Sequence, residues 1–127
     1  MDFTNYLADK LVNATVRNLP YTPVETVYLA LYVTDPTKEA TGIEVSAVSY
    51  TRQTITMAEP VDGVSTNLAQ IDFATATSDW GTVGWVGILD NTVSGNLLYF
   101  TALDSPKTIL TGDQLKINAN QLQLTLT

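Results

Sequence analysis

The chain contains no cysteine and no histidine among its 127 residues. Without a thiol or an imidazole it lacks the common nucleophile, the common general base and the ligands of nearly every zinc, copper or haem site. Basic residues are also scarce, with 6 Lys and Arg against 13 Asp and Glu, which gives a net charge of -7. Phosphate repels such a surface, so we expect no nucleic-acid partner. Because the chain lacks both the thiol and the imidazole, we also expect no metal, no cofactor and no enzymatic activity.

Long hydrophobic runs are absent as well. The longest, residues 27–33, is far shorter than the ~20 apolar residues of a membrane-spanning helix, so we expect no membrane partner. The N-terminus carries Asp2 and no basic segment ahead of an apolar core, which argues against a secretory signal and for a protein made in the cytoplasm. With 45% hydrophobic and 15% charged residues, the composition is typical of one globular domain that buries a core without disulfides.

One segment near the N-terminus has helical periodicity. The pattern predicts a helix from residue 4 to about residue 18, with Thr4 as N-cap and Pro20 preventing continuation. Its apolar residues recur every three or four positions and form a stripe of Phe3, Leu7, Leu11 and Ala14. We therefore divide the chain into an N-terminal helical segment, residues 1–19, and a β domain, residues 20–127.

The rest of the chain consists of short β-type runs separated by turn residues. This pattern predicts a mainly β protein, an antiparallel, jelly-roll-like sandwich of seven or eight strands preceded by the helix. The runs are residues 27–33, 49–57, 66–73, 82–89, 96–103, 114–117 and 121–127. The first is apolar on both faces and predicts a central strand, whereas the last alternates and predicts burial of Leu122, Leu124 and Leu126. Residues 34–46 are expected to form a mobile loop.

Few residues suggest chemistry. Asp35, Glu39 and Glu44 share one loop and offer oxygen ligands for calcium, but the ligand spacing and central glycine of an EF-hand are missing. A triad hydrolase is excluded, because there is no histidine and no G-x-S-x-G motif. Solvated carboxylates on turns and strand edges are therefore the favoured interpretation.

Residues 80–87 carry three glycines and two tryptophans. The Gly-Lys-Ser/Thr of a phosphate loop is absent, and the valines favour a strand whose glycines allow a bulge or the close approach of a neighbour. Trp80 and Trp85 suit a sugar-stacking platform, but aromatic residues in the core of a sandwich are commoner. We therefore expect both tryptophans to lie in the core.

Read from end to end, the chain resembles a family of small virion proteins of tailed bacteriophages, described as tail-fibre-like and, in some phages, as capsid cement or decoration proteins. The resemblance covers nearly the whole chain. The residues that carry it are 4–7, 10–11, 26–32, 35–37, 42–46, 50–53, 80–83, 86–88, 95–99, 107–109 and 112–117. It implies a structural part of the virion and transfers no catalytic residue.

The resemblance leaves two positions on the virion open. A fibre usually needs a long repetitive shaft, whereas a cement protein needs one compact block that binds many equivalent sites, and 127 residues suffice for one domain. We therefore favour a decoration protein on the capsid exterior that bridges subunits of the major capsid protein. The resemblance and capsid symmetry suggest a homotrimer. A tail-fibre or tail-tip protein that binds a host receptor or glycan is the alternative.

The apolar stripe of the helix has two interpretations. Phe3, Leu7 and Leu11 cap one end of the chain's own sandwich, or the stripe of Phe3, Leu7, Leu11 and Ala14 is an interface with a neighbouring subunit. We favour the interface, because Pro20 and Pro23 make a stiff, extended connector suited to holding the helix away from the β domain.

Overall fold

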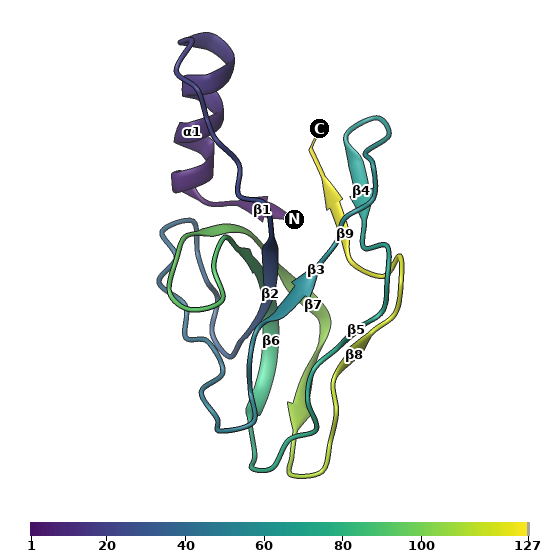
Figure 1. The fold of residues 1–127 in the computed structure, drawn as a ribbon. Coiled ribbons are helices and arrows are strands. Elements are labelled where there is room, and N and C mark those ends of the chain that lie inside the picture. The colour runs from purple at the N-terminus through teal and green to yellow at the C-terminus, as the bar shows by residue number, and fades with distance from the viewer. Residues whose placement is uncertain (127) are drawn as a thin grey trace.

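The computed structural model describes residues 1–126. Within them lies one helix, α1 (Asn5–Val16), preceded by the short strand β1 (Asp2–Phe3). The strands that follow are β2 (Val27–Tyr32), β3 (Gln53–Ile55), β4 (Val64–Thr66), β5 (Ile71–Asp72), β6 (Gly81–Leu89), β7 (Leu97–Ile109), β8 (Lys116–Ile117) and β9 (Gln123–Thr125). The prediction of a mainly β chain with one N-terminal helix is confirmed, although β1 was not predicted (Figure 1).

The main sheet is antiparallel and has five strands in the order β1-β7-β6-β2-β3. Two further antiparallel pairs, β4-β9 and β5-β8, complete the β body. The chain after β3 pairs with the chain around β4 through a bridge between Met57 and Asn67 and a hydrogen bond from the Ala58 amide to the Thr66 carbonyl. The main sheet is thereby continued into the smaller pairs, which lie beside it in Figure 1.

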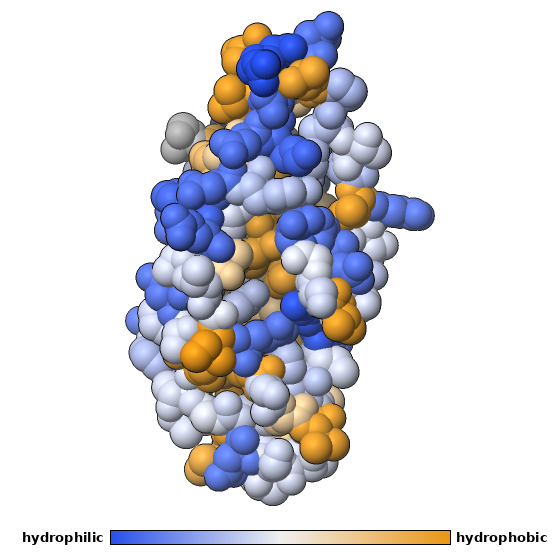
Figure 2. Space-filling model, turned by 90° about the vertical axis from the view of Figure 1, so that its left-hand side faces the viewer, coloured by the Kyte–Doolittle hydropathy of each residue, from blue (hydrophilic) through white to orange (hydrophobic). Residues whose placement is uncertain are grey.

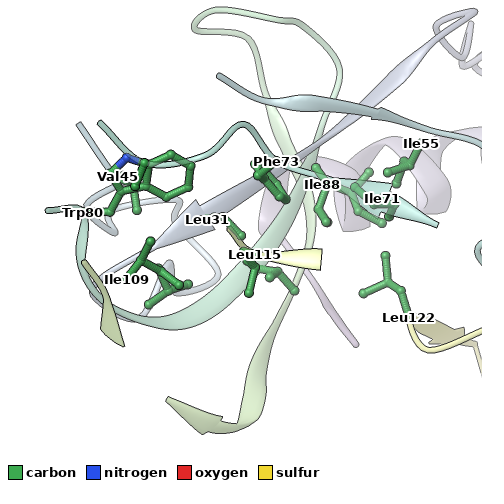
Figure 3. Packing of buried hydrophobic residues seen from close by; sticks show 14 residues of the cluster. Leu31, Val45, Ile55, Ile71, Phe73, Trp80, Ile88, Ile109, Leu115 and Leu122 are labelled. Atoms are coloured by element: carbon green, nitrogen blue, oxygen red, sulfur yellow. The ribbon is translucent and has the colours of Figure 1, made fainter. Parts of the chain in front are cut away.

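The larger hydrophobic cluster lies between the main sheet and these pairs. Leu31 from β2 and Ile88 from β6 meet Ile71 from β5, while Leu122 precedes β9. Figure 3 shows Phe73 and Leu115 near the centre of the cluster, with Trp80 towards one end and Leu122 towards the other. The predicted position of residues 27–33 is confirmed, because β2 lies between β6 and β3 and its residues Ala30 and Tyr32 belong to a second cluster.

The predicted run 66–73 is wrong as one strand, because a buried side chain interrupts it. Asn67 is fully buried, and its amide nitrogen donates to the carbonyls of Ala69 and Asn118 while its amide oxygen accepts from the Leu122 amide. The side chain thus takes backbone partners that a continuous ladder would use, and β4 and β5 are separate. Run 49–57 is likewise shorter than predicted, since only its residues 53–55 form β3, whereas run 96–103 extends to Ile109 in β7.

The last strand is only partly buried. Leu122 is buried as predicted, but Leu124 is half-buried and Leu126 is 43% exposed, so the expectation for these two residues was wrong. The physical reason is that β9 pairs with β4 alone, and this pair projects beyond the main sheet in Figure 1. The alternation of apolar and polar residues therefore predicted a strand correctly, but it did not predict how much of that strand packs against the core.

Candidate interaction site: the N-terminal arm

The N-terminal arm, residues 4–26, comprises α1 and the connector to β2. Its base is fixed by Thr4, which is 1% exposed. The Thr4 hydroxyl accepts from the Leu7 amide at 3.3 Å, as an N-cap does, and donates to the Leu97 carbonyl at 2.6 Å. The Thr4 amide also donates to the Leu98 carbonyl at 3.0 Å. The predicted N-cap is confirmed, and the same side chain ties the start of α1 to β7.

Lys38 holds the base of the arm from the other side. Its carbonyl accepts from the Asn5 amide at 2.8 Å, and its ammonium donates to the Phe3 carbonyl at 3.2 Å. The ammonium also lies 5.3 Å from the centre of the Phe3 ring, within the range of a cation–π contact. These contacts fix the point at which the arm leaves the β body.

The helix ends earlier than Pro20 required. Its last residue is Val16, with Arg17 as C-cap, and Asn18 has a φ of 55° in the left-handed region. The Leu19 amide then donates to the Asn13 carbonyl at 3.0 Å, which closes the end of the helix. Asparagine tolerates this conformation better than most residues, so Asn18 rather than the proline ends the helix.

The structure separates the four predicted interface residues into two groups. Phe3 is half-buried in β1, paired with Tyr99 of β7, and Leu7 is 3% exposed against the chain's own β body. Leu11 is half-buried and Ala14 is exposed. The stripe thus runs from the base of the arm, where it packs internally, to the outer turns, where it reaches the surface, and its contact with a neighbouring subunit stays a prediction.

The sequence analysis missed a second set of apolar residues on the outer part of the arm. Val12 is 54% exposed and Val16 is 76% exposed, and their spacing of four places them on one helix face. Leu19 and Val24 follow in the connector at 45% and 42% exposure. Hydrophobic residues are visible at the arm end of the molecule in Figure 2. The sequence signal that could have identified this surface is the spacing of Val12 and Val16, two apolar residues four positions apart that lie outside the predicted stripe.

The connector contains Pro20 and Pro23 and forms no helix or strand. In Figure 1 it returns beside α1 to the start of β2, and the two together project beyond the β sheets. The first turn of α1 packs on the β body through Leu7, so only the outer turns of the helix lie away from it as the proline-containing connector predicted. The arm therefore carries exposed apolar side chains on a part of the chain that projects from the β sheets.

The loop of residues 34–46 is braced rather than loose. The Val33 amide donates to the Ile43 carbonyl at 2.9 Å, and the Val45 amide donates to the Leu31 carbonyl at the same distance. Asp35 and Glu44 are engaged locally, the first with the Thr37 amide and the second in an ion pair. Among residues 1–126, no group of three or more carboxylates is placed to hold a metal ion.

Glu44, Arg52 and Tyr50 hold this loop through hydrogen bonds and are called the brace, with Glu44 at its centre. Arg52 binds its carboxylate with two nitrogens at 3.0 and 2.9 Å, and the Tyr50 hydroxyl donates to it at 2.6 Å. Hydrogen bonding to Glu44 raises the pKa of Arg52, while burial and the nearby carboxylate raise the pKa of Tyr32 to about 12. Burial, followed by the hydrogen bond to Glu44, also raises the pKa of Tyr50. The phenols of Tyr32 and Tyr50 are therefore neutral near neutral pH.

The two tryptophans do not form one platform. Trp80 is 5% exposed, its ring lies 5.4 Å from that of Tyr50 in an edge-to-face arrangement, and its indole N–H donates to the Ser49 hydroxyl at 3.1 Å. Trp85 is half-buried and packs against the second cluster. The prediction that both lie in the core is thus confirmed for Trp80 alone.

The glycines around Trp85 shape β6 and bind no phosphate. The register between β6 and β7 shifts between Val83 and Trp85, where Gly84 lies opposite a bulge formed by residues 103–106 of β7. A β-carbon on Gly87 would lie 2.6 Å from the Leu97 side chain, so Gly87 allows a close approach. Both predicted uses of glycine are confirmed, and the strand geometry excludes a phosphate loop.

A family model described as "Podophage GP4 fiber I protein gp80" matches residues 2–125. The chain belongs to this gp80 family of small tailed-phage virion proteins. The match spans both the arm and the β body, so the two parts occur together in the family model. A search of curated proteins finds no match.

Membership of the gp80 family assigns the chain to the structural proteins of the phage virion. Such fibre families are typically non-enzymatic. Within residues 1–126, no helix is long and apolar enough to cross a membrane.

Proposed function

We propose that this gp80-family chain is a non-enzymatic building block of the virion that attaches to a neighbouring virion protein through its N-terminal arm. The observation that carries the proposal is the arm itself, fixed at its base by Thr4 and presenting Val12 and Val16 at 54% and 76% exposure. A rigid element with uncovered apolar side chains gains free energy when a partner covers it. The β body then serves as the block that the arm fastens.

The attachment energy is modest for one arm. Full burial of a valine side chain contributes about 1.5–3 kcal/mol, and Val12 and Val16 are already partly covered, so ~1–2 kcal/mol each is reasonable. Each such increment changes a dissociation constant about tenfold. If the chain forms the homotrimer expected from the resemblance, three linked arms would bind with far greater avidity than one.

A fibre position on the virion is supported by the description of the gp80 family. A second position, decoration of the capsid exterior by contact with the major capsid protein, is favoured by the absence of any repetitive shaft from the described part of the chain. Attachment through the arm serves either position. Cryo-EM or immunogold labelling of the virion separates the two positions, because one places the chain at the tail and the other on the shell.

Point variants test the arm better than deletion of residues 1–19. That deletion would also remove β1 and Thr4, which pair with β7, so loss of folding and loss of attachment would be confounded. The double variant Val12→Ser/Val16→Ser removes the apolar groups from exposed positions and leaves the base intact. Val48→Ser is the matched control, because Val48 is 96% exposed and lies outside the arm.

The assay complements a phage that lacks the gene with each variant and counts copies of the chain per purified virion by quantitative mass spectrometry. We expect normal melting temperatures for all variants, a normal copy number for the control and at least a tenfold lower copy number for the double variant. Full incorporation of the folded double variant would overturn the proposal. Turnover of a polysaccharide panel by the purified chain would overturn its non-enzymatic part.

A further inference from the structure

The β body has a cleft of about 420 Å³ that is separate from the arm. One wall is residues 101–105 and Lys107 of β7, and the other is residues 116–118 and 121–123, around β8 and β9. Its volume falls in the range of ligand-binding clefts. Both walls are strand edges, and this shared feature determines what the cleft can bind.

The two edges lack strand partners where they face the cleft. β1 pairs with β7 only at Tyr99 and Phe100, so among residues 1–126 no strand lies along the outer edge of β7 beyond Phe100. On the opposite wall, β8 pairs only with β5, and β9 pairs only with β4. Strand edges of this kind present backbone donors and acceptors that a further strand can use.

A break in the β6-β7 register lies at the cleft. Pairing passes from Val83 with Lys107 directly to Trp85 with Ala102, so residues 103–106 of β7 have no partner in β6. A β-carbon on Gly84, which lies opposite this segment, would meet nothing within 4 Å. Bulges bend a strand and redirect its edge, and residues 103–105 of this bulge line the cleft.

The lining of the cleft combines apolar and polar side chains. Val86 and Leu122 are buried, with exposures of 1% and 6%, whereas Lys107, Lys116 and Asp104 are exposed. Two of the six basic residues therefore lie at this one cleft, in a chain of net charge -7. No aromatic ring lines it within residues 1–126, which disfavours a sugar, because sugars are bound by stacking on aromatic faces.

We propose that this cleft binds an extended, carboxylate-bearing segment of a different protein, which enters as an additional β-strand. Main-chain hydrogen bonds to the β7 edge would supply affinity, apolar side chains would contact Val86 and Leu122, and carboxylates would face Lys107 and Lys116. A different protein is favoured over a second copy at this cleft, because a two-fold pairing of two β7 edges would bring Lys107 and Lys116 of both copies together. The inference uses another surface than the arm and does not rest on it.

The test uses the full-length ¹⁵N-labelled chain and an end-capped synthetic peptide of about eight residues, in which Val alternates with Thr and Glu. At ~3.3 Å per residue this length spans the β7 wall. We expect chemical-shift changes and slowed amide exchange at residues 101–107 and 116–123. The same peptide with Lys in place of Glu should bind on the order of three- to tenfold more weakly.

Two variants separate charge from shape. Lys107→Glu/Lys116→Glu should weaken binding of the Glu peptide on the order of three- to tenfold, while the matched control Lys10→Glu/Arg17→Glu, on the arm, should leave it unchanged. Ser105→Trp places a large side chain at an exposed cleft position and should abolish binding of both peptides.

Four results would each overturn the proposal. They are the absence of shifts at millimolar peptide, peptide shifts outside the cleft, cleft shifts caused by soluble glycans instead of peptide, and cleft shifts that grow with protein concentration alone. The last result would indicate a second copy as the occupant. Because Val12→Ser/Val16→Ser leaves the cleft untouched, it should bind the peptide normally, which keeps failure of this inference distinct from failure of the arm.

Discussion

Replacement of Arg52 by alanine tests the brace around Glu44 most severely. The guanidinium makes two hydrogen bonds to the Glu44 carboxylate and donates to the carbonyls of Asn91 and Ser94 at 2.8 and 2.7 Å. It thus joins the loop of residues 34–46 to the turn between β6 and β7. The side chain of Arg52 is 8% exposed and that of Glu44 is 25% exposed, so the pair is largely shielded from water.

The structure sets the size of the effect. Removal of one partner from a buried ion pair costs about 3–5 kcal/mol, because the other charge is left without compensation. Glu44 is a quarter exposed and keeps its hydrogen bond from the Tyr50 hydroxyl, so water and the phenol recover part of this cost. We therefore expect Arg52→Ala to lower the free energy of unfolding by ~2–3 kcal/mol.

The assay is urea unfolding followed by tryptophan fluorescence. The double variant Arg52→Met/Glu44→Gln removes both charges. It should lose less stability than the sum of the losses of Arg52→Met and Glu44→Gln alone, because each single variant leaves one charge uncompensated and the double variant leaves none. A loss below about 1 kcal/mol for Arg52→Ala, or strict additivity in the cycle, would refute the view that the pair is a shielded brace.

Three further predictions concern the β body. The pKa of Tyr32 is about 12 in the folded protein, against 10 in the unfolded chain. The neutral phenol therefore contributes stability that is complete below pH 10 and is lost as the pH rises through 12. The midpoint of urea unfolding should accordingly be lower at pH 11 than at pH 9. Gly87→Ala should cost about 1–3 kcal/mol through overpacking, while Gly84→Ala, which meets nothing, should be close to neutral; equal effects would contradict the packing described. Trp80→Ala should cost ~3–5 kcal/mol and half-buried Trp85→Ala clearly less, as measured by thermal unfolding.

Local patterns carried much of the fold. Residues 27–33, apolar on both faces, predicted a strand buried on both faces, and residues 82–89 predicted β6 almost to its ends. Thr4 followed by helical periodicity predicted the start of α1 to the residue. These features depend on neighbours within one or two turns, which a sequence displays directly.

Features that depend on residues far apart in the chain could not be predicted from the sequence. Asn67 divides a predicted strand because its side chain reaches Asn118 and Leu122, more than 50 residues away. The pairing of β1 with β7 likewise needs a segment from the other end of the chain. The same holds for the candidate site. Helical periodicity identified the stripe that includes Leu7, but it could not show that the β body covers the base of this stripe and that Val12 and Val16 are exposed.

A cryo-EM reconstruction of the intact virion tests the central claim most directly. The account predicts that α1 lies against another virion protein, that Val12 and Val16 are buried in that contact, and that Thr4 keeps its place on β7. A map in which the outer turns of α1 face solvent, while the chain is held to the virion by its β body alone, would contradict it.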